Sequence, residues 1–193
     1  MNYPANISVE ELEHLDRMDF SGPIVVVDKE DEEYAEAIEY LSSQKVIGFD
    51  TETKPNFQAH VPRNKTALLQ LSGHDKAYLF RVNKLGIPSA LASILSNPAI
   101  IKVGAAVKED VRGLNYYRKF AGKGFVDLQT IVPNYGIEVK SVKKMSAIIL
   151  GKKVSKTQQL SNWEAPQLSG AQLKYAAIDA YVCREMYLKL QEK

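Results

Sequence analysis

The chain has 193 residues, of which 45% are apolar and 9% aromatic, which indicates one folded domain with a full core rather than a disordered segment. Its apolar runs are far shorter than the ~20 residues that span a bilayer, and Met1–Pro4 lacks the basic and apolar regions of a secretory signal. The single cysteine, Cys183, excludes an internal disulfide and indicates a reducing, cytoplasmic location. A glycine-rich phosphate loop of the Walker type is absent, which argues against the use of ATP.

The formal charge of +2 hides an asymmetry along the chain. Residues 1–43 carry twelve acids against Arg17 and Lys29, a net charge of −10, which leaves +12 on residues 44–193. A basic body of this kind suits a partner rich in phosphate. Charge alone does not separate that interpretation from acidic and basic surfaces that neutralise one another within one fold.

The chain reads as a single domain over residues 1–193, in which a helical arm (1–21) precedes the core (22–193). Ser8 and Glu11 have capping-box spacing and predict a helix through about Arg17. Gly22 and Pro23 end the arm. Its sequence leaves open whether it is a cap, an oligomer contact or a partner site.

The core pattern changes from strands to alternating elements. Its first half predicts a strand, a helix and three closely spaced strands: Ile24–Val27, Glu30–Leu41, Val46–Asp50, Ala67–Leu71 and Ala77–Phe80. Its second half predicts helix and strand in alternation, then two helices: Ser89–Leu95, Ile100–Gly104, Val107–Phe120, Phe125–Leu128, 141–150 and 170–190. Three antiparallel strands followed by this alternation predict an α/β fold, with a mixed sheet of five to six strands and helices on both faces.

Four carboxylates in three separate segments are the most informative feature. Asp50 and Glu52 lie two apart on a buried strand and project from one face. Tyr175 and Asp179 lie four apart on a helix, side by side, and the small Ala176, Ala177 and Ala180 allow this helix to lie close to the sheet.

Asp110 stands early in a helix, next to its apolar stripe. Taken singly, each signal also fits a solvated acid or a surface charge cluster. Together, acids held by a packed core need a cation, and hard divalent metals prefer carboxylate oxygens. The set points to two-metal phosphoryl chemistry.

The order and spacing of these segments resemble the DEDD superfamily of 3′-5′ exonucleases, in the subgroup with tyrosine in its third motif. Within it, the chain resembles Werner-type exonuclease domains and their stand-alone bacterial relatives, and, more distantly, ribonuclease D. The resemblance spans roughly residues 20 to 190 and is carried by Gly48-Phe49-Asp50-Thr51-Glu52-Thr53-Lys54-Pro55, Leu68-Leu69-Gln70-Leu71, Lys102-Val103-Gly104 leading to Asp110, Phe125-Val126-Asp127-Leu128, and Leu160-Ser161-Asn162-Trp163-Glu164 leading to Tyr175 through Tyr181. The other subgroup has histidine five residues before its last aspartate, where this chain has Lys174.

The resemblance implies a ribonuclease-H-like fold and two divalent cations, Mg²⁺ or Mn²⁺. It implies that Asp50, Glu52 and Asp179 hold one metal, and that Asp50 and, largely through water, Asp110 hold the second. Tyr175 would orient the attacking water. Asp127 recurs in the family pattern, and we interpret it as strand-end structure near the site rather than a ligand.

Contacts with the nucleic acid are expected from two regions. Glu52 and the backbone of Thr51–Thr53 would meet the terminal 3′ hydroxyl, and Phe57, Arg63 and Lys65 follow in the same loop. The stretch from Lys140 to Lys156 holds six lysines and no acid, and suits phosphates or a solvated face. The expected nucleic-acid-binding residues are Thr51, Thr53, Phe57, Arg63, Lys65, Lys152, Lys153 and Lys156.

The sequence thus predicts a metal-dependent 3′-5′ exonuclease that releases 5′ mononucleotides from a free 3′ end, with DNA favoured over RNA as substrate. Two alternatives stay open: an exoribonuclease that processes RNA 3′ ends, and a nucleic-acid-binding module that keeps the fold without catalysis. Neither a membrane nor ATP is an expected partner. The oligomeric state is left undetermined.

Overall fold

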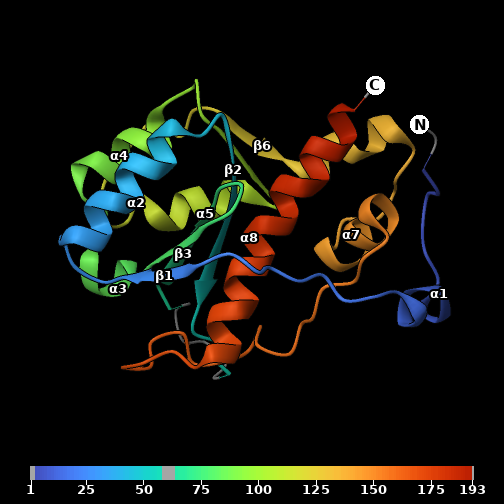
Figure 1. The fold of residues 1–193 in the computed structure, drawn as a ribbon, viewed down its shortest axis with the longest axis horizontal. Helices are drawn as coiled ribbons and strands as arrows, with labels where there is room; N and C mark the ends of the chain where they lie inside the picture. The colour runs from blue at the N-terminus through green and yellow to red at the C-terminus, as the bar shows by residue number, and fades with distance from the viewer. Residues whose placement is uncertain (1–2, 58–63, 193) are drawn as a thin grey trace.

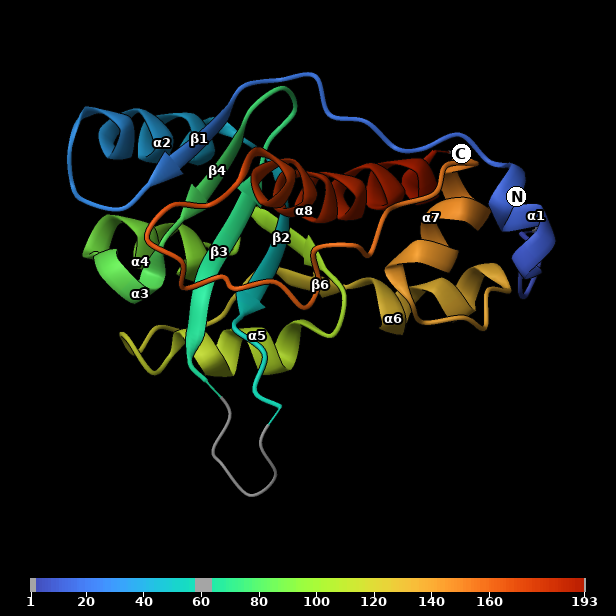
Figure 2. The same cartoon turned by 90° about the horizontal axis from the view of Figure 1, so that it is seen from below.

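A six-stranded mixed sheet organises the part of the chain that the computed structural model describes, residues 3–57 and 64–192 (Figures 1 and 2). The strand order is β1-β4-β3-β2-β5-β6. The strands are β1 (Ile24–Val27), β2 (Val46–Thr53), β3 (Thr66–Ser72), β4 (Ala77–Phe80), β5 (Ile101–Gly104) and β6 (Phe125–Asp127). The pairs β2–β3 and β3–β4 are antiparallel, and the pairs β1–β4, β2–β5 and β5–β6 are parallel. The predicted meander and mixed sheet are confirmed.

Helices cover both faces of this sheet, as predicted. They are α1 (Val9–His14), α2 (Glu32–Ser43), α3 (Val82–Leu85), α4 (Ser89–Ser96), α5 (Val107–Leu114), α6 (Leu128–Ile131), the 3₁₀ helix η1 (Val132–Tyr135), α7 (Val142–Leu150) and α8 (Gly170–Gln191). Helices α2, α4 and α5 share one buried apolar cluster with one face of the central strands. Helix α8 crosses the opposite face, with α7 beside it (Figure 1).

Helix α8 lies unusually close to the sheet because both surfaces lack bulk at the crossing. Ala176, Ala177 and Ala180 are fully buried. At Gly48 on β2, a Cβ atom would lie 1.8 Å from the carbonyl oxygen of Ala180. The strand that carries Asp50 and the helix that carries Asp179 are therefore in backbone contact.

Several predicted boundaries were wrong, for local reasons. Helix α5 ends at Leu114 rather than Phe120, because the Asn115 side chain donates to the Val111 carbonyl (2.9 Å) and accepts from the Phe120 N–H (3.0 Å). Helix α1 has the predicted capping box but ends at His14, where the arm becomes extended. The one-turn elements α3, α6 and η1 were not predicted, since so short a helix has no periodicity to detect.

The N-terminal arm runs from α1, past α7 and α8, to β1 (Figures 1 and 2). Cys183 and Trp163 are buried in the core. Within the described residues, no helix combines the length and the apolar character needed to cross a membrane.

Candidate active site

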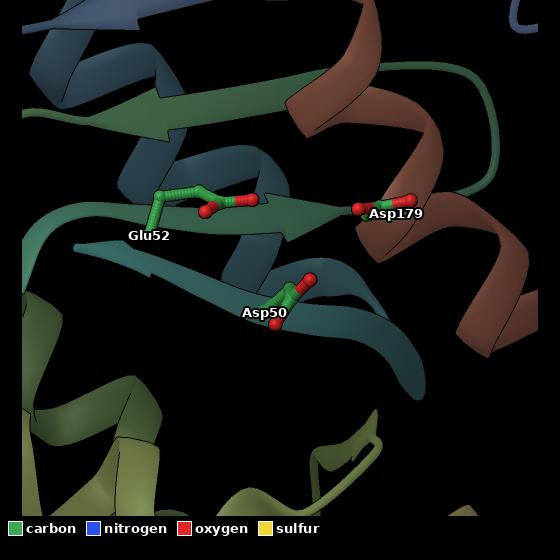
Figure 3. Close-up of side chains that lie close together, drawn as sticks. All are labelled: Asp50, Glu52 and Asp179. Carbon is green, nitrogen blue, oxygen red and sulfur yellow. The ribbon is translucent and has the colours of Figure 1, made fainter. Parts of the chain in front are cut away.

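Three carboxylates from β2 and α8 converge above the sheet (Figure 3). One carboxylate oxygen from each of Asp50, Glu52 and Asp179 lies within 4.8 Å of the other two. Asp50 and Glu52 share a face because they are two apart on β2, and the close approach of α8 brings Asp179 over them. Residues 127 or more positions apart along the chain are thus held together by a helix–sheet contact.

Burial raises the pKa of all three acids, and the charges of neighbouring acids raise it further for Asp50 and Glu52. The pKa of Asp50 is raised well above its ordinary value, first by burial and then by the charges of Asp179 and Asp110. Burial, followed by the charges of the neighbouring aspartates, raises the pKa of Glu52 to about 10. Burial raises the pKa of Asp179 to about 7, against the opposing effects of the Tyr175 hydroxyl and of Lys156. Such a cluster is stable as carboxylates only when a cation shares it.

Asp110 lies beside this tight group rather than in it. Its carboxylate accepts a hydrogen bond of 2.6 Å from the Thr51 hydroxyl, and burial raises its pKa to about 6. Its charge raises the pKa of both Asp50 and Glu52. The charge of Asp110 therefore acts on the group, although its carboxylate is not one of the three that converge within 4.8 Å.

Asp127 sets the start of the helix that carries Asp110. Its carboxylate accepts from the backbone N–H groups of Ala106 (3.0 Å), Val107 (3.2 Å) and Gln129 (2.9 Å). Ala106 is the only described non-glycine residue in the left-handed region, with φ of 58°. These three bonds agree with our interpretation of Asp127 as strand-end structure.

Tyr175 lies against Asp179 on the inner face of α8. Its hydroxyl group lies close to the acidic cluster, and burial together with the charges of Asp179, Glu52 and Asp50 raises the pKa of the phenol. The ring packs on Trp163, with 5.9 Å between ring centroids. The phenol is held as a neutral group that can donate and accept at once.

Two adjoining hollows surround these groups. A cavity of about 260 Å³ contains Asp50, Glu52, Tyr175 and Asp179, with Lys156 on its wall. A second, of about 340 Å³, contains Thr51, Thr53, Lys65 and Asp110. In the second hollow, the Lys65 ammonium group lies 3.8 Å from the centroid of the Tyr116 ring.

The other predicted nucleic-acid contacts fall in different places. Phe57 is 80% exposed. Arg63 lies outside the described residues. Lys152 forms an ion pair of 3.0 Å with Asp16, and the Lys153 ammonium group donates to the Glu13 carbonyl. Both of these lysines therefore contact the N-terminal arm, whereas Lys156 faces the carboxylates.

Sequence reasoning missed polar residues that line the carboxylate cavity, namely Gln129, Ser141, Ser155 and Gln159. They come from three separate segments, and no motif distinguishes them from ordinary surface residues. Lys140 and Lys143, in the lysine-rich stretch, line the same cavity.

The acidic cluster is consistent with an enzyme of the metal-dependent nuclease class. The chain matches the 3′-5′ exonuclease family over residues 24–193, and so belongs to that family. It is 35% identical over 150 residues to exonuclease 3′-5′ domain-containing protein 2 of Drosophila melanogaster, covering 76% of this chain and 25% of that protein. It is 33% identical over 159 residues to the bifunctional 3′-5′ exonuclease/ATP-dependent helicase WRN of Mus musculus, covering 78% of this chain and 11% of that protein.

The fold agrees with solved structures. Escherichia coli RNase D superposes with a TM-score of 0.75 at 22% identity, over 90% of this chain and 44% of that chain. The predicted ribonuclease-H-like fold and family are confirmed. The chain spans a quarter or less of the two curated relatives named above.

Proposed function

We propose that this 3′-5′ exonuclease removes 5′ mononucleotides from the free 3′ end of DNA with the help of two divalent cations, Mg²⁺ or Mn²⁺. The observation that supports the proposal is the convergence of Asp50, Glu52 and Asp179 within 4.8 Å, with Asp110 beside them. Asp50, Glu52 and Asp179 would hold one cation, and Asp50 with Asp110 the other. Two such ions would supply hydroxide and stabilise the leaving 3′ oxygen.

The chain's own residues position the reactants. The Tyr175 hydroxyl lies close to Asp179, and its ring is held by packing on Trp163. In this position the hydroxyl orients the attacking water. The Thr51 hydroxyl fixes one oxygen of Asp110. Glu52 and the backbone of Thr51–Thr53 meet the terminal 3′ hydroxyl, and Lys156 faces the phosphate.

The remaining expected nucleic-acid-binding residues would contact the substrate strand outside the carboxylate cavity. Phe57 offers an exposed aromatic face for stacking on a base, and Lys65 lies in the hollow next to Thr53. Arg63 belongs to the same loop in the sequence. Lys152 and Lys153 would act on phosphates only if they left their contacts with the arm.

The alternatives are distinguished by substrate. The names of two relatives, DNA polymerase I of Aquifex aeolicus and ribonuclease D of Gluconacetobacter diazotrophicus, at 29% and 28% identity, point to different nucleic acids for those proteins. Discrimination between them depends on contacts with the 2′ hydroxyl near the 3′ end. A module without catalysis is disfavoured because all four acids and Tyr175 are present. A cytoplasmic location stays a prediction.

The test is an incubation of the purified protein with a 3′-recessed DNA duplex and a single-stranded RNA, each labelled at its 5′ end. Mg²⁺, Mn²⁺ or EDTA is added in parallel. A metal-dependent ladder that shortens from the 3′ end of DNA faster than of RNA supports the proposal. Faster shortening of RNA assigns the substrate to RNA, and binding without shortening under any metal leaves the non-catalytic module.

A further inference from the structure

The N-terminal arm is fastened to the core next to the carboxylates. The Met18 N–H donates to the Lys153 carbonyl (2.8 Å), and the Lys153 N–H donates to the Asp16 carbonyl (2.9 Å), so that Arg17 and Lys153 form a parallel β-bridge. At the far end, the Phe20 ring is buried and packs on Tyr181 of α8, with 5.0 Å between ring centroids. The backbone of Asp16–Met18 therefore has a defined place.

Between the arm and α8 lies a side cavity of about 480 Å³ that is partly open to solvent. Its lining includes Arg17, Met18 and Asp19 from the arm, together with Lys174 and Ile178 from α8. It shares Ser155, Tyr175 and Asp179 with the carboxylate cavity, so the two spaces adjoin. A volume within the usual 300–1,000 Å³ of small-molecule sites has room for one nucleotide unit.

The lining combines a free cation with hydroxyl groups and an apolar wall. Among the described residues, the Arg17 guanidinium has no hydrogen-bond or ion-pair partner, and its side chain is exposed. Ser155 and Thr157 present hydroxyl groups 3.0 Å apart. The Lys174 ammonium is paired with Asp19 (2.7 Å), while Met18 and Ile178 supply apolar surface. Arginine and hydroxyl donors bind phosphate oxygens, and the apolar wall suits a sugar or base.

We propose that this side cavity is a binding subsite for one nucleotide of the substrate strand, in which Arg17 binds a backbone phosphate close to the 3′ end. The proposal rests on the exonuclease function proposed above. It gives the N-terminal arm a role in substrate binding. Arg17 lies before residues 24–193, the range that matches the family, so this role is not part of the family match. Asp19 has the opposite effect, because its carboxylate neutralises Lys174 within the same cavity.

The experiment measures binding of a 5′-fluorescein single-stranded oligonucleotide by anisotropy in EDTA, where metal-dependent hydrolysis stops. Arg17→Gln is expected to bind about tenfold more weakly, the range of a charge-assisted hydrogen bond, and to reduce the slope of log K against log salt by about 0.7. Asp19→Asn is expected to bind more tightly, since it frees Lys174. Lys29→Gln, which removes the same charge from an exposed ion pair with Asp31, is the matched control and is expected to bind as wild type.

A scan with single neutral methylphosphonate linkages then locates the phosphate. Wild type is expected to lose affinity at one linkage near the 3′ end at which Arg17→Gln loses none. Binding of Arg17→Gln equal to that of Lys29→Gln, or an unchanged methylphosphonate pattern, would overturn the proposal. Weaker binding by Asp19→Asn would also overturn the proposal. If the substitutions acted by loosening the arm, both Arg17→Gln and Asp19→Asn would bind more weakly, whereas loss of a phosphate contact weakens binding only in Arg17→Gln.

Failure of the exonuclease proposal looks different. Wild type would then leave the 3′ end intact in Mg²⁺ and Mn²⁺, while the binding differences between Arg17→Gln, Asp19→Asn and Lys29→Gln would still decide whether the side cavity binds phosphate.

Discussion

At the scale of single residues, the site is held in an arrangement that costs folding free energy without a cation. Asp50 and its neighbours are buried beside like charges, which raises their pKa values. Each unit of such a shift corresponds to about 1.4 kcal/mol of unfavourable interaction in the ionised form. Residues that are needed for function are thus unfavourable for stability.

Substitution Asp50→Asn or Asp179→Asn is expected to lower turnover by about 10³-fold or more, because a cation site loses several kcal/mol of charge stabilisation. In EDTA the same variants are expected to melt a few degrees higher than wild type, since folding no longer has to bury a carboxylate or to protonate it. Activity assays and thermal melts measure the two effects. Asp28→Asn, a change in an exposed ion pair with Lys84, is the control. Wild-type activity in either aspartate variant contradicts the site assignment.

Tyr175→Phe is expected to retain activity, roughly 10- to 100-fold below wild type, because it loses only the orientation of water. The pKa of Tyr175 is raised above its ordinary value of about 10, so the phenol stays protonated between pH 6 and 9. The pH profiles of wild type and variant are therefore expected to have the same shape. If the wild-type pH profile has a limb that is missing from the profile of Tyr175→Phe, Tyr175 instead acts as a proton-transfer group.

At the scale of elements, the contact between α8 and β2 assembles the site. It needs glycine at position 48, where the backbone oxygen of Ala180 occupies the space of a side chain. On the other side, Asp127 orients the first turn of α5 through Ala106 and Val107. Each of the separated acids is therefore placed by a specific inter-element contact.

Gly48→Ala is expected to destabilise the fold by about 1–3 kcal/mol or more through overpacking. Its activity is expected to fall about 10²-fold or more, because a shift of α8 by about 1 Å moves Asp179. Gly170→Ala is the matched control. Apart from the adjacent residues and the backbone of α8 itself, no atom lies within 4 Å of the place that an added Cβ would take, so the change is expected to be neutral or to stabilise by up to about 1 kcal/mol. Melting temperature and turnover are measured on both, and equal effects in the two variants would refute the close-contact argument.

At the scale of the whole molecule, stability is linked to pH and metal. Burial raises the pKa of Asp110 to about 6, of Asp179 to about 7 and of Glu52 to about 10. Above the ordinary pKa values near 4, the folded chain therefore binds more protons than the unfolded chain. Each such group makes stability fall as pH rises toward its folded pKa, by at most about 1.4 kcal/mol per pH unit.

Because of these acids, the melting temperature in EDTA is expected to fall as pH rises from 5 to 8. Mn²⁺ or Mg²⁺ is expected to raise it by an increment that grows over the same range, because ligands must lose protons to bind metal. Asp179→Asn is expected to flatten both trends. A metal increment that is independent of pH would show that these carboxylates are not the ligands.

Much of the fold followed from local pattern. Strands Ile24–Val27 and Ala77–Phe80 match their predicted bounds, because alternation, apolar runs and turn residues act over a few neighbours. The ends of α1 and α5 did not follow, since side-chain hydrogen bonds and the pairing of Arg17 with Lys153 decide them. The acids Asp50, Glu52, Asp110 and Asp179 could be selected from spacing and family resemblance.

The sequence by itself therefore determined the family, the element order and the identity of the acids, because each depends on residue types at short or recurring spacings. The tertiary structure alone decided that Lys152 and Lys153 contact the arm whereas Lys156 faces the carboxylates. It also decided that Arg17 reaches a cavity next to Tyr175. The contacts of the arm join segments more than 130 residues apart, and no local pattern encodes them. They exist only because α8 packs on the sheet and the arm docks beside it.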